Sequence, residues 1–352
     1  MIAVVLVGGE GTRLRPLTLD RPKPMLPIAG RPFLVHFLDR LGAAGVERVI
    51  LSCGYLPDAI REVVGDGLPG GPPVEYAIEP EPLGTAGAIR FAAEGRVGDE
   101  PFLALNGDVL ADADLGAVVA GHRAAQASAT IVLTPKDDPR RWGVVLTDGT
   151  GAVTAFLEKP EPSPELGDPP YWINAGAYVL DPAVLDLIPA GRPVSIEREV
   201  FPQLVGKGLR AVRDHGYFND IGTPASYLRA NHDVLDGTAR TTIGGGADLV
   251  TVAPDAAVDP AARLVGPCLV GPGASVGPGA CVGPYAVVGA RARVAHGAQV
   301  VRGVVHEDAD VGVAARVQDA VVGTRARVAA SAAVADRIVA PDEHVEPDAR
   351  PA

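Results

Sequence analysis

Up to about residue 235, short apolar runs alternate with longer amphipathic stretches. Four of the apolar runs have the length and composition of buried strands, at 2–7, 48–52, 74–78 and 102–105. Apolar residues recur at helical spacing over 33–41, and further helices are expected at roughly 85–95 and 112–125. Strands that alternate with helices in this way predict an α/β fold with a doubly wound, mostly parallel, Rossmann-like sheet.

From about residue 250 the apolar pattern changes to a repeat of six residues. Branched aliphatic residues occupy every sixth position, at Val252, Val258, Leu264, Val270, Val276, Val282, Val288, Val294 and Val300. Later repeats come in groups of three with a slightly shortened corner, so three steps make one coil of a triangular β-helix. This pattern resembles the hexapeptide-repeat family, whose members form left-handed parallel β-helices.

The two patterns predict two domains, and a chain of 352 residues is also longer than a single core usually supports. We expect an α/β domain at 1–236 and a β-helix domain at 247–352. The Gly- and Thr-rich stretch 237–246 is the expected linker.

Composition narrows the possible partners. The formal net charge of -12 argues against nucleic acid, because that partner requires a basic surface. A local cluster of Arg13, Arg15, Arg21 and Lys23 still suits a small anionic ligand. The cysteines form no CxxC pair, and the apolar run at the N-terminus is too short to cross a membrane. We therefore expect a cytoplasmic protein with no membrane partner.

A glycine-rich loop follows the first predicted strand, with the sequence GGEGTRLRPLT at 8–18, and PKPMLP follows at 22–27. Such a loop lets backbone N–H groups approach a phosphate. Its spacing matches neither the P-loop nor the GxGxxG motif. The complete motif resembles the signature of the sugar-1-phosphate nucleotidylyltransferases, also called sugar-nucleotide pyrophosphorylases.

The resemblance assigns roles in nucleotide binding and catalysis. It implies a nucleotide loop formed by Gly8, Gly9, Gly11 and Thr12. Arg13 then steadies the triphosphate and Lys23 stabilises charge near the reacting α-phosphate, so both are candidate catalytic residues.

The segments further along resemble the parts of this family that contact base and sugar. In EPLGTAGA at 81–88, the resemblance implies nucleotide contacts by Glu81, Gly84 and Thr85, and Thr85 is also expected to cap the next helix. In EKP at 158–160 and INAG at 173–176, it implies that Glu158 and Asn174 bind sugar hydroxyls and that Lys159 reaches the sugar phosphate. Gly143 matches another position of the sugar pocket.

Two aspartates are candidate metal ligands. Asp108 follows the run at 102–105, at the strand end where open α/β sheets bind ligands, and Asp220 lies in FNDIGTP at 218–224. Either residue alone would be an ordinary turn or cap residue. Both resemble the family's metal-binding positions, and two carboxylates with substrate oxygens suit Mg²⁺. The resemblance therefore implies Mg²⁺ as cofactor.

The implied reaction transfers a nucleoside monophosphate from an NTP to a sugar 1-phosphate and releases pyrophosphate, without a covalent intermediate. Mannose-1-phosphate guanylyltransferases are the branch that the motifs resemble most, so GTP and mannose 1-phosphate are the expected substrates. Ala88 and Phe218-Asn219 depart from that branch, where Pro and Trp are common. Thymidylyl or uridylyl transfer to glucose 1-phosphate or another hexose phosphate therefore stays an alternative.

Two other classes of function also remain open. Hexapeptide β-helices often carry acyl transfer with a His base, but the repeat shows no obvious inserted loop, and we expect His296 and His306 at the surface. A non-catalytic sugar-nucleotide sensor is disfavoured because Asp108 and Asp220 are both present. The β-helix is expected to serve assembly of a homo-oligomer.

Overall fold

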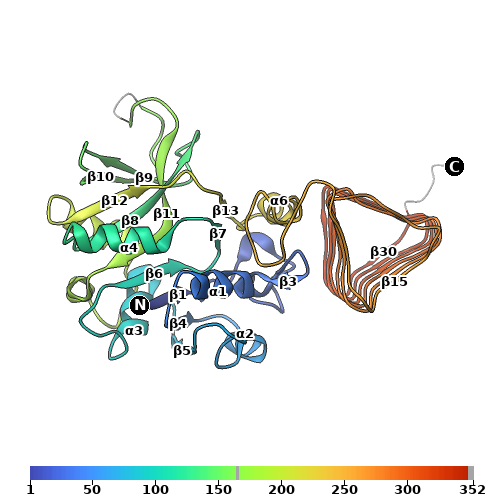
Figure 1. The fold of residues 1–352 in the computed structure, drawn as a ribbon, viewed down its shortest axis with the longest axis horizontal. Helices are drawn as coiled ribbons and strands as arrows, with labels where there is room; N and C mark the ends of the chain where they lie inside the picture. Colours follow the sequence, from blue (N-terminus) through green and yellow to red (C-terminus); the bar gives the residue numbers. More distant parts are fainter. Residues whose placement is uncertain (164–165, 348–352) are drawn as a thin grey trace. The chain divides into compact units, whose positions relative to one another are not determined.

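The computed structural model describes residues 1–163 and 166–347 and is shown in Figure 1. Packing divides the chain into two compact units. The first consists of Met1–Glu10 with Phe37–Phe218, and the second of Gly11–His36 with Asn219–Ala352. Each unit therefore combines segments that are far apart in sequence. The domain ranges 1–236 and 247–352 stay a prediction.

A sheet of nine strands forms the centre of the first unit. Its strands are β1 (Ile2–Leu6), β4 (Arg48–Cys53), β5 (Val74–Ile78), β6 (Phe102–Asn106), β8 (Ala129–Lys136), β9 (Gly143–Thr147), β10 (Val153–Glu158), β11 (Tyr171–Leu180) and β12 (Leu209–Arg213). The four strands predicted from sequence lie side by side in the order β5-β4-β1-β6 and are parallel, which confirms the α/β fold. Beyond β6, the long strand β11 runs antiparallel to β6, β8 and β9, so that part of the sheet is mixed.

The predicted helices are present to within a few residues. They are α1 (Phe33–Ala43), α3 (Gly84–Ala93) and α4 (Leu115–Ala124), with the short strand β7 (Val109–Ala111) before α4. Helices α2 (Pro57–Val64) and α5 (Phe201–Leu204) were not predicted. A 3₁₀ helix, η4 (Pro182–Leu187), and a π-helical turn, η5 (Ile196–Val200), lead into α5. Helix α3 packs against β1 and β4, and α4 packs against β8 and β11. Both helices thus bury an apolar face on the sheet.

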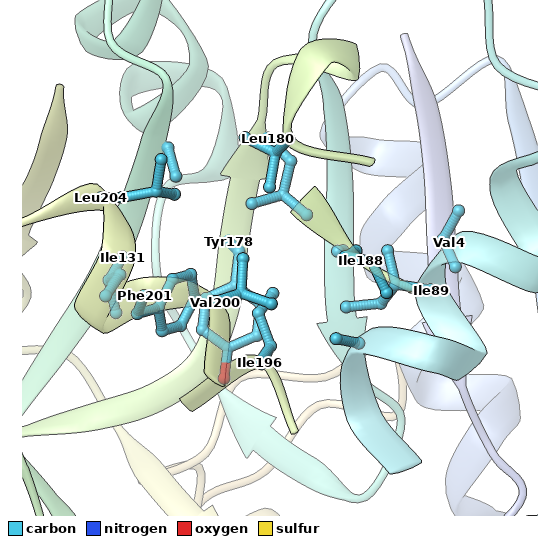
Figure 2. Close-up of a cluster of buried hydrophobic side chains, with 14 of the residues drawn as sticks. Val4, Ile89, Ile131, Tyr178, Leu180, Ile188, Ile196, Val200, Phe201 and Leu204 are labelled. Atoms are coloured by element: carbon cyan, nitrogen blue, oxygen red, sulfur yellow. The ribbon is translucent and has the colours of Figure 1, made fainter. Parts of the chain in front are cut away.

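Figure 2 shows the hydrophobic core of the first unit, where side chains from distant segments meet. Val4 of β1, Ile89 of α3 and Ile131 of β8 are all fully buried in it. Tyr178 of β11 packs edge-on against Phe201 of α5, with 5.1 Å between the ring centroids. Burying these aliphatic and aromatic groups stabilises the sheet by about 2 kcal/mol for each large side chain. The core fixes the strand ends from which the loops of the candidate site begin.

The second unit contains the basic signature loop and one long helix. Its non-repetitive elements are the 3₁₀ turns η1 (Thr12–Leu14) and η2 (Lys23–Met25), the hairpin strands β2 (Pro27–Ile28) and β3 (Arg31–Pro32), the last two residues of strand β13 (Phe218–Asp220) and helix α6 (Pro224–Leu235). Helix α6 begins with a capping box, in which Thr223 and Ser226 each bind the other's backbone N–H. It packs against β2, so the signature loop and α6 form one packed structure.

The C-terminal part of the second unit is a left-handed parallel β-helix, whose coils appear in Figure 1 as stacked triangles. The first of its three sheets contains β14 (Val250–Val252), β17 (Cys268–Val270), β20 (Ala286–Val288), β23 (Val304–Val305), β26 (Val321–Val322) and β29 (Ile338–Val339). The second contains β15 (Ala257–Val258), β18 (Ser275–Val276), β21 (Arg293–Val294), β24 (Asp310–Val311), β27 (Arg327–Val328) and β30 (His344–Val345). The third contains β16 (Arg263–Leu264), β19 (Cys281–Val282), β22 (Gln299–Val301), β25 (Arg316–Gln318) and β28 (Ala333–Ala335).

Strand register confirms the predicted coil length and the shortened corner. Val270 pairs with Val288, but Val288 pairs with Val305 and Val305 with Val322, so later coils lack one residue. The valines, together with small alanines at the corners, fill the interior. Every coil buries its branched side chains only against its neighbours, as expected for a solenoid.

The expected linker is a compact connection. The backbone N–H of Gly246 donates to Leu235 O at 3.0 Å, and that of Ala239 donates to Asp233 O at 2.7 Å. A Cβ on Gly245 would lie only 2.3 Å from Val234 O, so only glycine fits there. The segment 237–246 is therefore packed against the end of α6.

All three cysteines are free thiols, with Cys53 and Cys268 buried and Cys281 partly buried. Within the described ranges 1–163 and 166–347, no helix combines the length and the apolar character needed to cross a membrane.

Candidate active site

A cleft of about 400 Å³ opens in the first unit at the carboxyl ends of β1, β4 and β5. Five residues predicted to bind nucleotide line it: Gly8, Gly9, Glu81, Gly84 and Thr85. Its other walls include Gly54, Tyr55, Glu79 and Ala88. The cleft occupies the place where open α/β sheets bind their ligands.

Glycines allow the backbone segments around this cleft to approach one another. A Cβ on Gly8 would lie 3.0 Å from Gly54 N, and one on Gly84 would lie 2.7 Å from Val194 O. Gly84 also has a φ of +68°, in the region that favours glycine. Larger residues at these two positions would force the loops of the cleft apart.

Glu79 is a residue of this cleft that the sequence analysis missed. It follows β5 directly, and its carboxylate accepts hydrogen bonds from Ser52 Oγ at 2.9 Å and from the backbone N–H of Leu83 at 3.2 Å. These bonds leave each carboxylate oxygen a further acceptor position. The rule that singled out Asp108, an acid just after an apolar strand, also applies to Glu79 and could have found it.

The expected helix cap at Thr85 is wrong. Helix α3 begins at Gly84, and the residue before it, Leu83, makes no side-chain cap. The Thr85 hydroxyl instead donates to Glu197 Oε2 at 2.8 Å and accepts from the backbone N–H of Ile196 at 2.9 Å. The cap fails because the helix already includes Thr85 and because the Thr85 hydroxyl binds Glu197 and Ile196 instead.

A hydrogen-bond network connects this helix start with Asn174 in the first unit. Glu197 Oε1 lies 3.5 Å from the Tyr178 hydroxyl, which accepts a hydrogen bond from Asn174 Nδ2 at 2.8 Å. Asn174 Oδ1 accepts from the backbone N–H of Gly176 at 2.9 Å. Burial of the Tyr178 ring raises the pKa of its hydroxyl well above the usual value, so it stays protonated. Asn174 is thus held in one orientation and keeps one N–H and one lone pair for a ligand.

The predicted sugar-side residues Gly143, Glu158 and Lys159 lie together. Glu158 of β10 pairs with Gly143 of β9, and a Cβ on Gly143 would lie 3.0 Å from Glu158 Oε2. The Lys159 ammonium lies 3.8 Å from Glu158 Oε1 and is more than half exposed. Asn174 belongs to the same end of the sheet, because Ile173 pairs with Val144. The structure therefore brings all four sugar-side candidates to one region.

Asp108 follows β6 beside a close contact between strands. The backbone N–H of Gly107 donates to Leu6 O at 2.9 Å, and a Cβ on Gly107 would lie 2.6 Å from Val7 Cγ1. The residue before Asp108 must therefore be glycine. The partly buried Asp108 carboxylate is fixed to the carboxyl end of the parallel strands.

The remaining candidates, Gly11, Thr12, Arg13, Lys23 and Asp220, belong to the second unit. Gly11 has a φ of +62°, and a Cβ there would lie 3.0 Å from Lys23 Cβ. The Thr18 hydroxyl donates to Gly11 O at 2.9 Å, which closes the loop. Thr12 is exposed at the start of η1, whereas Lys23 is buried.

Arg13 reaches the segment that carries Asp220. A Cβ built on Gly222 would lie 2.8 Å from Arg13 Nη2 and 3.2 Å from Asp220 Oδ2. The guanidinium and the carboxylate therefore both lie against Gly222. The structure places a candidate phosphate-binding cation beside a candidate metal ligand.

Comparison with known proteins adds to this geometry. The nucleotidyl transferase family model matches residues 2–237, and the GMPPB C-terminal domain model matches residues 264–349. This chain belongs to the nucleotidyl transferase family. A relative from Mycobacterium tuberculosis named mannose-1-phosphate guanylyltransferase is 46% identical over 279 residues, which cover 78% of this chain and 76% of the relative. A probable mannose-1-phosphate guanylyltransferase 2 from Arabidopsis thaliana is 38% identical and covers 77% of this chain and 75% of its own length.

Solved structures also resemble this nucleotidyl transferase. HddC from Yersinia pseudotuberculosis has a TM-score of 0.58 and 31% identity, over 66% of this chain and 98% of HddC. The same protein complexed with GMP-PN has a TM-score of 0.56 and 32% identity. These matches support the assignment of the first part of the chain to nucleotide chemistry.

Nucleotidyl transferases of this type generally use a divalent metal ion. No group of three or more His, Cys, Asp or Glu suited to hold a metal occurs among the described residues. The carboxylate of Asp108 and that of Asp220 are each the type of oxygen ligand that a hard cation prefers. Substrate phosphates can supply further oxygen ligands to such an ion.

The two histidines of the repeat differ in their surroundings. His296 is exposed, as expected, but His306 is only 2% exposed, so its expected surface position is wrong. His306 Nε2 lies 2.9 Å from the Tyr227 hydroxyl. The repeat pattern missed this contact because Tyr227 lies outside the β-helix. A buried His306 bound to a tyrosine cannot serve as the exposed base of an acyltransferase.

Proposed function

We propose that this nucleotidyl transferase moves GMP from GTP to mannose 1-phosphate and releases pyrophosphate. The names of its relatives support these substrates, and one structural observation supports the choice of base. The Glu79 carboxylate lies in the nucleotide cleft with acceptor positions to spare.

A carboxylate at this position distinguishes guanine from uracil and thymine by the hydrogen-bond donors that each base offers. Guanine offers two adjacent donors, N1–H and the N2 amino group, which two carboxylate oxygens can accept together. Uracil and thymine offer one N–H between two carbonyl oxygens, which a carboxylate repels. Glu79 therefore favours GTP over UTP and dTTP. Glu81, which is exposed at the edge of the same cleft, is the alternative base contact.

The proposed chemistry is an in-line attack of the sugar phosphate on the α-phosphorus of GTP. Lys23 and Arg13 stabilise negative charge on the phosphates, and Lys159 binds the sugar phosphate. Asp108 and Asp220 would hold Mg²⁺, which neutralises phosphate charge when bound. A phosphate monoester is already ionised near neutral pH, so the chain needs no general base.

The proposed sugar contacts come from Glu158 and Asn174. The Glu158 carboxylate accepts hydrogen bonds from hydroxyls, and Asn174 has one N–H and one lone pair available. Gly143 leaves room beside Glu158, since a side chain there would contact Phe156 and the carboxylate.

The decisive test measures pyrophosphate release from GTP, dTTP, UTP, ATP and CTP, each with mannose 1-phosphate and glucose 1-phosphate, with and without Mg²⁺. Preference for GTP with mannose 1-phosphate, lost on chelation of the metal, supports the proposal. Preference for dTTP or UTP with glucose 1-phosphate refutes the substrates but keeps the reaction. No release from any pair refutes the reaction itself.

We further propose that the protein is a cytoplasmic homo-oligomer assembled through its β-helix. Flat β-helix faces suit symmetric pairing, and reduced cysteines suit the cytoplasm. Light scattering on the full chain tests the assembly, and a monomeric mass at micromolar concentration contradicts it.

A further inference from the structure

The β-helix contacts the segment that carries Lys23 through an ion pair at the start of that segment. Arg21, the residue before Pro22, donates a short hydrogen bond to Glu307 Oε1, and the Thr324 hydroxyl donates to the same oxygen at 3.2 Å. Burial alone would raise the pKa of Glu307, but the hydrogen bond and charge of Arg21 lower it to about 2. The pair is thus ionised and partly shielded from water.

A second contact holds the other end of the same segment. The buried Tyr227 hydroxyl of α6 donates to Pro27 O at 2.6 Å. Its single hydrogen is used there, so His306 Nε2 must carry the hydrogen of the 2.9 Å bond between His306 and Tyr227. Burial lowers the pKa of His306 to about 4, which keeps the ring neutral.

The two contacts start from neighbouring residues of one β-helix corner. His306 reaches Pro27 through Tyr227, and Glu307 binds Arg21 directly. All of these residues belong to the second unit, which also includes Lys23. One corner of the β-helix therefore holds both ends of the segment 22–26.

The segment between these ends has little freedom. Pro22, Pro24 and Pro27 fix their own φ angles. The backbone N–H of Met25 donates to Pro22 O at 2.8 Å, and that of Leu26 donates to Lys23 O at 3.1 Å. Fixing both ends of so stiff a segment also fixes the backbone of Lys23.

We propose that His306 and Glu307 are positioning residues that hold Lys23 in its catalytic place. The inference rests on the proposed function, because it takes Lys23 as the group that stabilises the α-phosphate. It gives the β-helix a part in catalysis in addition to any part in assembly. Neither residue touches the substrate; both act through the segment 22–26.

The test uses the full chain with Glu307→Gln, which removes the charge, and Tyr227→Phe, which removes both hydroxyl bonds but keeps the ring. We expect each variant to lower kcat about 10- to 100-fold, because sub-ångström misplacement of a group that acts in the transition state has effects of this order. KM for both substrates should change less than about threefold, since ground-state binding is kept. Arg21→Gln combined with Glu307→Gln should lose no more activity than either change alone.

Asp308→Asn is the matched control. Asp308 is the next residue after Glu307, and it binds Arg291 within the β-helix at 2.6 Å and 2.7 Å. Asp308→Asn removes one negative charge at the same corner, as Glu307→Gln does, but it does not affect the segment 22–26. An equal loss of kcat in this control, or unchanged kcat in both test variants, overturns the proposal.

Hydrogen exchange of the amides of Lys23, Met25 and Leu26 provides a readout that needs no turnover. Glu307→Gln and Tyr227→Phe should speed this exchange at least about tenfold, whereas Asp308→Asn should leave it unchanged. Unchanged exchange in both test variants refutes the positioning role even if the wild-type protein is active. If the wild-type protein releases no pyrophosphate from any pair, the proposed function fails, and exchange alone decides whether the corner holds the segment.

Discussion

Replacing Glu79 with Gln tests the proposed base contact directly. The substitution keeps the size of the side chain and one acceptor oxygen, but it turns the other oxygen into an NH₂ donor. In the cleft, the new NH₂ group faces one of the two guanine N–H groups. The Glu79 oxygen that it replaces accepts a hydrogen bond from that N–H group. The variant therefore loses at least one charge-assisted hydrogen bond to GTP.

The structure sets the size of the expected effect. A hydrogen bond to a charged group contributes about 1.5–3 kcal/mol, and the remaining neutral acceptor is weaker than the carboxylate. A loss of about 2–3 kcal/mol corresponds to roughly a 30- to 150-fold lower kcat/KM for GTP. For UTP the amide can donate to a carbonyl and accept from N3–H, so we expect kcat/KM to stay level or rise.

The assay is pyrophosphate release under kcat/KM conditions with GTP and UTP in parallel, using Glu81→Gln as the matched control. Because Glu79 also binds Ser52 and Leu83, the thermal midpoint of each variant is measured as well. A fall of equal size for GTP and UTP refutes the reasoning, since loss of cleft structure affects every nucleotide. A change of preference in Glu81→Gln alone moves the base contact to Glu81.

Three further predictions concern stability and positioning. Gly84→Ala should lower the free energy of unfolding by about 2 kcal/mol or more, because its φ is +68° and its Cβ would lie 2.7 Å from Val194 O. Urea denaturation checks this against Gly9→Ala, whose Cβ has no neighbour within 4 Å; equal losses contradict it. Gly222→Ala should leave unfolding within about 0.5 kcal/mol of wild type yet lower kcat/KM about tenfold or more, because its Cβ displaces the flexible end of Arg13. Unchanged kcat/KM in Gly222→Ala would show that activity does not depend on the position of Arg13 against Gly222. The folded-state pKa of His306, about 4, is below its ordinary value of 6.5, so the unfolded chain binds the proton first. Its contribution, up to about 3 kcal/mol, is complete above pH 6.5 and is lost as the pH falls towards 4. As the pH falls from 7.5 to 6 and 4.5, the urea midpoint should therefore decline more steeply in wild type than in His306→Gln. Equal declines in the two proteins would contradict this role of His306.

The predictions from sequence were most successful where local periodicity determines structure. Strands β1, β4, β5 and β6 are short apolar runs that end at glycines or polar residues. Such runs are typical of buried strands, so the pattern predicted these elements directly. The six-residue period fixed the β-helix for the same reason, because each coil buries the same positions. Mixed pairing at β11 was not predictable, since strand direction depends on how distant strands pack.

Contiguous motifs account for most of the candidate residues that the structure brings together. Gly8, Gly9, Glu81, Gly84 and Thr85 come from two motifs and line one cleft. The cap at Thr85 failed because sequence does not show that Glu197, more than a hundred residues away, binds that hydroxyl. Residue type alone indicates which groups a side chain can bind, but the fold determines which of them it meets.

The corner at His306 shows how a repeat can reveal such distant contacts. Strand register aligns Gly271, Gly289, His306 and Gly323 at successive coils, so His306 replaces a glycine of the repeat. Glycine is needed at the neighbouring corners, because a Cβ on Gly289 would lie 2.8 Å from the next coil's backbone. His306 departs from the glycine of this column, and its side chain contacts Tyr227, which lies outside the repeat. At this corner the departure from the repeat coincides with the contacts to the rest of the chain, since His306 meets Tyr227 and the next residue, Glu307, pairs with Arg21.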